Sequence, residues 1–211
     1  MYLSKLVLRA KDAVLRDIYD AHQALWKLYS DGPDRKRDFL FRELDPLTFL
    51  CLSARQPRDD LGVWHMAVKP FEPKLAEGDR LYVSLRANAV VKRRTAEGRQ
   101  VRYDVVQDAR RRFKERGEEP PPRAELAQEH GGKWLLARQK GLGLVFEEDS
   151  LVVESYLVRH YWRDGNKASF GALDMAGFAV VADVAKALES LHQGVGPGKG
   201  FGCGLLLARR A

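Results

Sequence analysis

The sequence predicts an α+β protein made of two consecutive small units. Strand-like runs, in which apolar and polar residues alternate, occur in both halves of the 211-residue chain. Apolar residues at helical spacing separate these runs near the N-terminus, in the middle and near the C-terminus. A chain of this length suits two cores of about 100 residues each. We therefore expect an N-terminal domain over residues 1–90 and a C-terminal domain over residues 91–211.

The N-terminal half is expected to contain one helix among several strands. Residues 2–9 alternate as a strand does, and five apolar residues then share a helical face: Val14, Ile18, Ala21, Leu25 and Leu28. Asp12 is the expected N-cap of this helix, and Asp31-Gly32-Pro33 is expected to end it. Further strands are expected at 38–44, 48–54 and 80–86. This order is typical of a ferredoxin-like unit.

The C-terminal half is expected to combine strands with two helices. A helix is predicted over 105–116, and Gly117 to Pro122 then forms an exposed loop. Strands are predicted at 133–146, 151–162, 169–175 and 178–181, with a turn at Asp164-Gly165-Asn166. Asp183 is the expected N-cap of a last helix, which ends at Gly194. This half is also compatible with a ferredoxin-like fold.

Positive charge is concentrated in one part of the chain. The formal net charge is +7, and the stretch from Arg86 to Arg116 holds eleven basic and four acidic residues. This stretch therefore carries the whole surplus. Such a concentration favours a polyanionic partner through phosphate pairing and counterion release. A solvated helix face or a disordered basic loop is the alternative interpretation.

A polar and aromatic stripe on the first helix is a candidate active site. Tyr19, His22 and Trp26 are spaced i, i+3 and i+7, so their side chains lie within about 60° of one another around the helix. An imidazole with a pKa of about 6.5 can accept or donate a proton near neutral pH. Cleavage of RNA by its own 2′-hydroxyl needs both transfers. On spacing alone, these side chains are also typical of an ordinary surface or interface.

Two C-terminal features are candidate RNA contacts. The run from Gly194 to Gly204 holds six of the eighteen glycines, which allows backbone amides to approach phosphate, and Lys199 adds charge. Tight backbone packing explains such a run equally well. It is not a nucleotide-binding phosphate loop, because no Ser or Thr follows the lysine. The expected hairpin over 154–175 carries basic and aromatic residues near its tip, namely Arg159, His160, Tyr161, Trp162, Arg163 and Lys167. Such a ribbon suits a nucleic-acid groove, although an ordinary amphipathic hairpin has the same pattern.

Several classes of protein are not expected. Cys51 and Cys203 lack a zinc-site spacing, so both are interpreted as buried free thiols. No set of carboxylates and histidines has convincing metal spacing, and we expect no metal and no cofactor. No apolar run approaches the roughly 20 residues that span a bilayer, and the N-terminus does not have the pattern of a signal peptide. We therefore expect a cytoplasmic protein.

Five segments in the same order carry a resemblance to a known family. They are Met1 to Lys5, Arg16 to Trp26, Arg37 to Arg42, Leu85 to Asn88 and Gly194 to Leu206. The sequence resembles the CasE family of CRISPR repeat-RNA endoribonucleases, the processing subunit of type I-E Cascade complexes. The resemblance implies two tandem ferredoxin-like (RRM-like) domains. It also implies that a repeat stem-loop is cleaved at its base by 2′-hydroxyl attack, which leaves a 2′,3′-cyclic phosphate.

The resemblance also implies roles for individual residues. His22 falls on the family's catalytic histidine and Tyr19 on its companion tyrosine. Lys27 falls where some relatives place a basic residue, although it lies about 140° from His22 around the helix. The expected RNA-binding residues are Arg86, Lys92, Arg93, Arg94, Arg159, Arg163, Lys167 and Lys199. The chain departs from the family at Ala87-Asn88-Ala89, where relatives commonly have a proline last.

Two other functions stay open at this point. A non-catalytic subunit of a ribonucleoprotein could bind the same RNA with an incidental histidine. A metal-dependent nuclease is the second alternative. The partners expected in the first instance are CRISPR repeat RNA and the other Cascade subunits.

Overall fold

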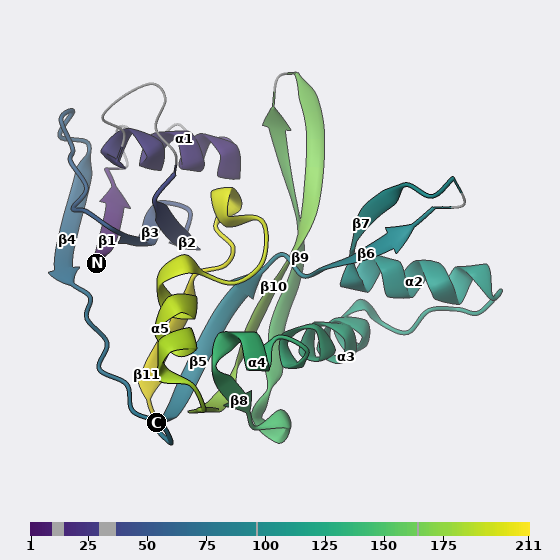
Figure 1. Ribbon diagram of the computed structural model, residues 1–211. Coiled ribbons are helices and arrows are strands. Elements are labelled where there is room, and N and C mark those ends of the chain that lie inside the picture. Colours follow the sequence, from purple (N-terminus) through teal and green to yellow (C-terminus); the bar gives the residue numbers. More distant parts are fainter. Residues whose placement is uncertain (10–14, 30–36, 96, 164) are drawn as a thin grey trace.

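Two larger antiparallel sheets and a separate two-stranded sheet, β6-β7, organise the described part of the chain (Figure 1). The computed structural model describes residues 1–9, 15–29, 37–95, 97–163 and 165–211. The strands are β1 (Tyr2–Leu8), β2 (Phe39–Asp45), β3 (Thr48–Ser53), β4 (Trp64–Pro70), β5 (Arg80–Ala87), β6 (Val90–Arg94), β7 (Gln100–Asp104), β8 (Leu144–Phe146), β9 (Val152–Arg163), β10 (Asn166–Val181) and β11 (Leu206–Arg210). The helices are α1 (Ile18–Tyr29), α2 (Val105–Glu115), α3 (Arg123–Leu136), α4 (Gln139–Leu142) and α5 (Val184–Gln193). The expected α+β fold class is confirmed.

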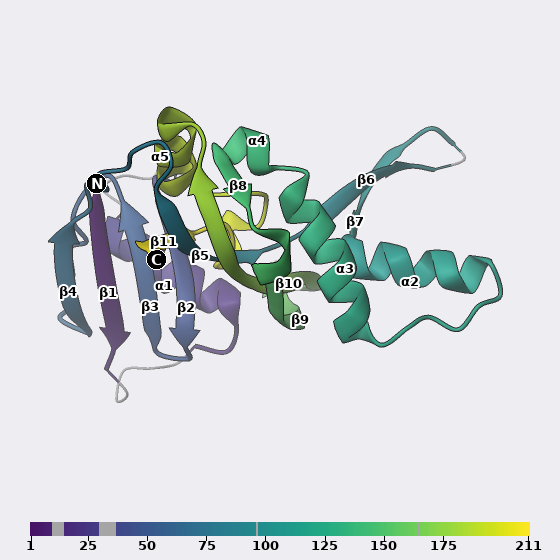
Figure 2. The same cartoon turned by 90° about the horizontal axis from the view of Figure 1, so that it is seen from below.

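The first sheet has the strand order β2-β3-β1-β4, with every pair antiparallel (Figure 2). Its central strands are the first and third in sequence, as in a ferredoxin-like unit. Helix α1 packs its apolar face on this sheet, where Leu25 meets a core that includes Leu6, Phe41 and Phe49. That face is the one predicted from the helical spacing. Asp12 and Asp31-Gly32-Pro33, the expected helix ends, lie outside the described residues.

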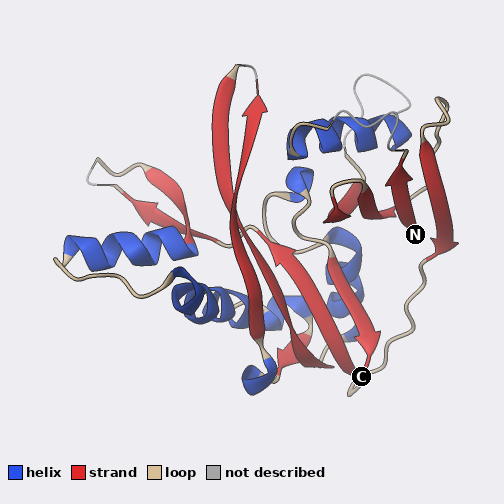
Figure 3. Cartoon of the chain, turned by 180° about the vertical axis from the view of Figure 1, so that it is seen from behind, coloured by secondary structure: helices blue, strands red, loops and turns tan. Residues whose placement is uncertain are grey.

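The second sheet has the order β11-β5-β10-β8, and β9 also pairs with β10. Strands β8 and β9 pair with successive parts of β10, so together they act as one edge strand that is interrupted by a short 3₁₀ turn at Glu148–Ser150. This order is again ferredoxin-like. Helices α3, α4 and α5 lie on one face of the sheet (Figures 1 and 3). The paired ends of β9 and β10 extend past β5 as a two-stranded ribbon.

Several elements differ from those expected. Residues 133–146, predicted as a strand, form the end of α3, all of α4 and only the short β8. Within α3, a Cβ on Gly131 would lie 3.2 Å from Leu173 Cδ1, so a glycine at this position allows the helix to pack close to β10. Residues 169–175 and 178–181 belong to one strand, β10. Strand β4 and the hairpin β6–β7 were not predicted.

The division between the sheets also differs from the expected one. The first sheet ends with β4 at Pro70, and β5 is hydrogen-bonded between β10 and β11 in the second sheet. The boundary expected at residue 90 therefore lies beyond a strand that belongs to the second sheet. An alternating apolar strand has the same pattern whichever sheet it joins. Cys51 and Cys203 are both free and buried, as expected. No helix among the described residues is long and apolar enough to cross a membrane.

A buried ion cluster joins the two sheets. Arg42 of β2 donates a 3.0 Å hydrogen bond to Asp174 Oδ1, and Arg86 of β5 donates to both oxygens of that carboxylate at 2.8 and 3.0 Å. Ser155 Oγ also donates to Asp174, at 2.9 Å. The three charged side chains are only 10–18% exposed. Burial by itself would raise the pKa of Asp174, but the hydrogen bonds and charges of the two arginines outweigh it and lower that pKa.

Replacing Asp174 with Asn is expected to lower the free energy of unfolding by about 3 kcal/mol, because two buried guanidinium groups lose their counter-charge. Urea denaturation followed by circular dichroism measures this change. Asp149→Asn, at an exposed position, is the matched control and should leave stability within about 0.5 kcal/mol of wild type. Equal stability of the two variants would contradict the structural role of the cluster.

Candidate active site

The first turn of α1 is fixed by the side chain of Asp17. Its Oδ1 accepts the backbone N–H groups of Tyr19 at 2.8 Å and Asp20 at 3.1 Å, which is the geometry of an N-cap. Its Oδ2 accepts the backbone N–H of Trp162 at 2.9 Å. One carboxylate thus caps the helix and attaches it to the tip of the β9–β10 ribbon.

His22 lies in an aromatic environment on the exposed side of the α1 core. Its ring centroid is 6.5 Å from that of Tyr19 and 5.9 Å from that of Trp26, so the predicted stripe is present. Phe39 and Phe41 of β2 lie behind it, each at 6.4 Å with nearly parallel rings. The Nε2 atom is shielded from solvent and has no hydrogen-bond partner among the described residues. The ring is therefore held by packing against these aromatic side chains.

The positive charge of Arg37 lies near this imidazole. A Cβ on Gly200 would lie 3.3 Å from Arg37 Nη1 and 3.9 Å from His22 Nε2, which places the loop backbone beside both side chains. Burial and then the charge of Arg37 lower the pKa of His22 below 6.5. The imidazole is therefore mostly neutral at pH 7. Burial and the same arginine also lower the pKa of Lys199.

The glycine-rich run, residues 194–204, carries the backbone into the space between α1, β2 and the second sheet. Gly202 has φ +76°, and a Cβ there would lie 3.3 Å from Phe41 Cε2. Gly198 has φ +77° and a similar restriction against Asn88. Lys199 Nζ donates to the carbonyl of Gln193 at 2.7 Å, which holds its charge close to the loop. The close-packing interpretation of the run is confirmed at Gly198 and Gly202, whereas the approach of its backbone amides to phosphate stays a prediction.

The structure brings Tyr19 to His22 but not Lys27. Tyr19 is partly exposed, and its ring adjoins the imidazole. Lys27 lines a separate cavity on another side of α1, with Asp20, Arg58 and Asp60.

The β9–β10 ribbon stands next to this site. Arg159 forms an ion pair with Glu43 of β2, and Lys167 is exposed. The ring of Tyr161 contacts that of Phe201, with the centroids 4.4 Å apart and the planes tilted by 35°, which joins the ribbon to the glycine-rich run. The side chain of Arg163 lies outside the described residues. Arg159 is thus engaged in holding the ribbon, whereas Lys167 faces solvent.

Some cations of the basic stretch form ion pairs within the fold, and others are exposed to solvent. Arg86 lies inside the cluster with Asp174 and also donates to the carbonyl of Glu43 at 3.0 Å. Lys92 and Arg94 are exposed on β6. Arg93, between them, forms a 2.6 Å ion pair with Asp108. A run of charge in the sequence indicates its sign but not its partner, so the structural use of Arg86 was not foreseen.

Arg37 is the main site residue that sequence reasoning missed. It lies in one of the five segments that carry the family resemblance, but nothing in its spacing links it to α1. The sequence therefore pointed to Arg37 only through its place in that segment. The described residues contain no group of three or more His, Cys, Asp or Glu side chains arranged to hold a metal ion.

A neutral imidazole can move protons, and the neighbouring cation of Arg37 can stabilise a developing negative charge. The nitrogen of His22 can accept a proton from a hydroxyl group or, once protonated, donate one. Arg37 and Lys199 can stabilise a phosphoryl oxygen that becomes more negative. The arrangement suits chemistry at a phosphodiester.

Comparison with known proteins gives a consistent result. A family model described as "CRISPR associated protein" matches residues 1–210. The chain is 29% identical to the Cascade subunit CasE of Escherichia coli, over 98% of both chains. It is 31% identical to the CRISPR-associated endoribonuclease Cse3 of Thermus thermophilus, again over 98% of both chains.

Solved structures show the same likeness. The crystal structure of Cas6e from Escherichia coli superposes with a TM-score of 0.72 at 25% identity, over 100% of both chains. A Thermus thermophilus Cse3 structure with an RNA that represents a pre-cleavage complex gives a TM-score of 0.72 at 27% identity, over 99% of this chain and 98% of the other. The expected resemblance is thereby confirmed, and the chain belongs to the CRISPR associated protein family.

Proposed function

We propose that the protein is a metal-independent endoribonuclease that binds the stem-loop of CRISPR repeat RNA and cleaves it at the base of the stem. The 2′-oxygen attacks the adjacent phosphorus, the 5′-oxygen departs, and the guide RNA ends in a 2′,3′-cyclic phosphate. The observation that carries this proposal is the free nitrogen of His22 beside Arg37 and the loop at Gly200. The endoribonuclease named among its relatives supports the same reaction class.

The roles follow from the chemistry of the step. The 2′-hydroxyl must lose a proton and the 5′-oxygen must gain one, and His22 performs one of these transfers. Tyr19 assists the transfer or positions the ribose. Arg37 and Lys199 stabilise the negative charge of the pentavalent phosphorane. The bound stem aligns the 2′-oxygen with the bond that breaks.

RNA binding is assigned first to cations that the fold leaves exposed, namely Lys167 on the ribbon with Lys92 and Arg94 on β6, which would pair with phosphates. Arg163 is assigned to the same set from its place in the sequence beside the turn of the ribbon. Arg86 and Arg159 would contribute indirectly, because their ion pairs hold the ribbon against the first sheet. The solved Cse3 structure with a pre-cleavage RNA supports an RNA substrate, and the Cascade subunit among the relatives supports assembly with other Cascade subunits. We infer that the protein works in the cytoplasm.

His22→Ala is expected to lower the single-turnover rate of repeat cleavage by about 10²- to 10⁴-fold, the range for loss of a general acid or base. Gel analysis of a labelled repeat hairpin in excess EDTA measures the rate, and a filter assay measures binding. His65→Ala is the matched control, since His65 is exposed on β4. Binding without cleavage by the wild type would favour a non-catalytic RNA-binding subunit. Loss of wild-type cleavage in EDTA would favour a metal-dependent nuclease.

Affinity for the stem-loop is expected to fall steeply with salt, because phosphate contacts release counterions. The slope of log K against log salt should lose about 0.7 to 0.9 for each phosphate contact that is removed. Lys167→Ala should therefore give a shallower slope than wild type in titrations between about 50 and 200 mM salt. An affinity that does not change over this range would contradict the electrostatic basis of binding.

Arg37→Gln is expected to raise the pKa of His22 in the free protein, because it removes a nearby positive charge. Burial, the larger cause, remains, so the pKa should stay below 6.5. An NMR titration of the imidazole carbons measures both values. As the pH falls through this pKa, the ring gains its charge, and the neutral form dominates above it. Identical titration of wild type and variant would mean that Arg37 does not act on the imidazole.

A further inference from the structure

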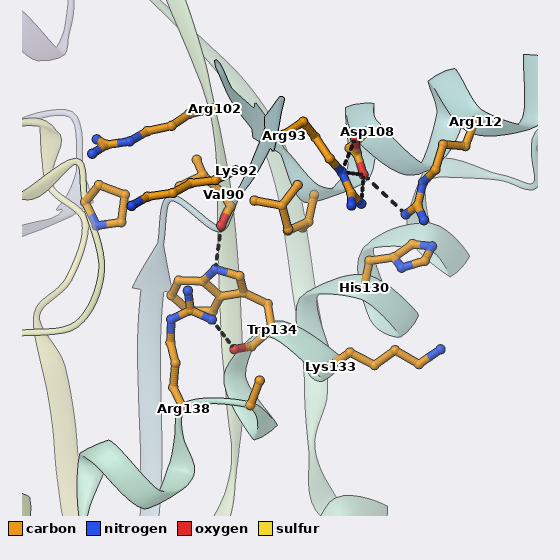
Figure 4. Close-up of a pocket in the computed structure, with 14 residues that line it drawn as sticks. Val90, Lys92, Arg93, Arg102, Asp108, Arg112, His130, Lys133, Trp134 and Arg138 are labelled. Atoms are coloured by element: carbon orange, nitrogen blue, oxygen red, sulfur yellow. Dashed lines mark hydrogen bonds and ion pairs between the residues drawn. The ribbon is translucent and has the colours of Figure 1, made fainter. Parts of the chain in front are cut away.

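A basic groove, which His22 does not line, lies beside the hairpin β6–β7 (Figure 4). Its volume is about 680 Å³, within the roughly 300 to 1,000 Å³ of small-ligand pockets. It therefore has room for one or two nucleotides. The hairpin forms one wall, α2 and α3 form the other, and Pro197 of the glycine-rich run closes one side. Valine and alanine side chains contribute apolar surface between the charged groups.

The charge of the groove is strongly unbalanced. Six lysine and arginine side chains line it, together with the single carboxylate of Asp108: Lys92, Arg93, Arg102, Arg112, Lys133 and Arg138. Asp108 is 1% exposed and is already within ion-pair distance of Arg93 and Arg112. Burial lowers the pKa of His130, so this lining side chain is mostly neutral at pH 7. The groove thus presents a net positive surface with its one acidic group occupied.

Arg138 gives the groove a flat cationic surface. Its guanidinium carbon lies 3.8 Å from the ring centroid of Trp134, and its Nη1 donates to the Trp134 carbonyl at 2.7 Å. The indole in turn donates to the Val90 carbonyl at 3.2 Å, so the stack is fixed to the hairpin. Within the described part of the chain, Arg138 has no carboxylate partner, and burial lowers its pKa. A half-buried cation without a counter-ion is stabilised by an incoming phosphate.

Lys92 and Arg102 complete this surface from the opposite wall. They are direct partners across the β6–β7 ladder, and both are exposed. Neither forms an ion pair with a carboxylate among the residues that the structure describes. Unpaired RNA is recognised by such a combination, in which phosphates meet cations and bases stack on guanidinium planes or aromatic rings.

The glycine-rich run connects the groove to His22. Pro197 lines the groove, and a Cβ on Gly196 would lie 3.1 Å from Trp134 Cη2. Three residues beyond Pro197, Gly200 lies beside Arg37 and His22. Three extended residues span at most about 11 Å, so the groove begins close to the proposed cleavage site. An RNA strand that leaves this site could therefore enter the groove and contact its lysine and arginine side chains.

We propose that this groove binds the unpaired RNA that continues 3′ of the cleaved linkage. The inference rests on the proposed function and adds a second binding site for the same substrate. The stem-loop lies on the ribbon, whereas the downstream single strand passes Lys199 and enters between β6–β7 and α3. The groove would hold the strand on the far side of the attacked phosphorus and so help to align the departing 5′-oxygen.

The test compares the affinities of three RNAs: a bare stem-loop, one with a short 5′ extension and one with a short 3′ extension. A 2′-deoxy nucleotide at the attacking position prevents cleavage during the measurement. Wild type is expected to bind the 3′-extended RNA about tenfold more tightly than the bare stem-loop, as one stacked base and its phosphate would give. Arg102→Ala should reduce this ratio, and Arg102→Ala with Arg138→Gln should bring it close to one.

Lys69→Ala with Lys74→Ala is the matched control, because it removes the same charge from exposed positions outside the groove and should keep the tenfold ratio. Thermal melting confirms that each variant is folded, and Arg102, being exposed, gives the safer single variant. A gain from the 5′ extension instead, or a ratio that is unchanged in the groove variants, would overturn the inference. If wild type binds the bare stem-loop and gains no affinity from either extension, the inference about the groove is wrong, but the proposed function is not contradicted. Wild type that binds none of the RNAs would overturn the proposed function itself.

Discussion

The buried carboxylate of Asp174 is the interaction on which the arrangement of the two halves depends. It receives Arg42 from the first sheet and Arg86 from the second, so the hydrogen bonds that satisfy it can form only in one relative position of the sheets. Such a cluster is directional, unlike the apolar contacts around it, because each guanidinium must meet the oxygens in its own plane. Leu40 and Leu205 belong to one apolar cluster, which adds buried apolar area at the same junction but restricts the relative orientation of the sheets less.

The candidate site lies at this junction and draws on separate parts of the chain. His22 comes from α1, Arg37 from the segment before β2, and Lys199 from the run between α5 and β11. No one of these segments contains a site by itself. The packing of the sheets therefore sets the distances between these side chains, while the glycines at 200 and 202 allow the loop backbone to come close to α1 and β2.

Features that depend on residues close together in the sequence were predicted correctly. Features that depend on which distant segments pack together were not. The apolar face of α1, the cap at Asp183 and the glycine at the end of α5 follow from residues that are near one another in the chain. Strand β4 has no alternation because all its residues after Trp64 are exposed. By contrast, the stripe with His22 could be found from helical spacing, because its residues are close together in the sequence. Arg37 and the buried use of Arg86 could not, since both depend on which distant segment packs beside them.

The double use of Asp17 restricts which residues evolution can accept at that position. Serine or asparagine caps a helix as well as aspartate does, but each has a single side-chain oxygen that can accept, whereas Asp17 accepts on two. A lineage that replaced this aspartate with another good cap would keep the helix and lose its attachment to the ribbon. The constraint at Asp17 thus comes from the geometry of its hydrogen bonds to two separate elements.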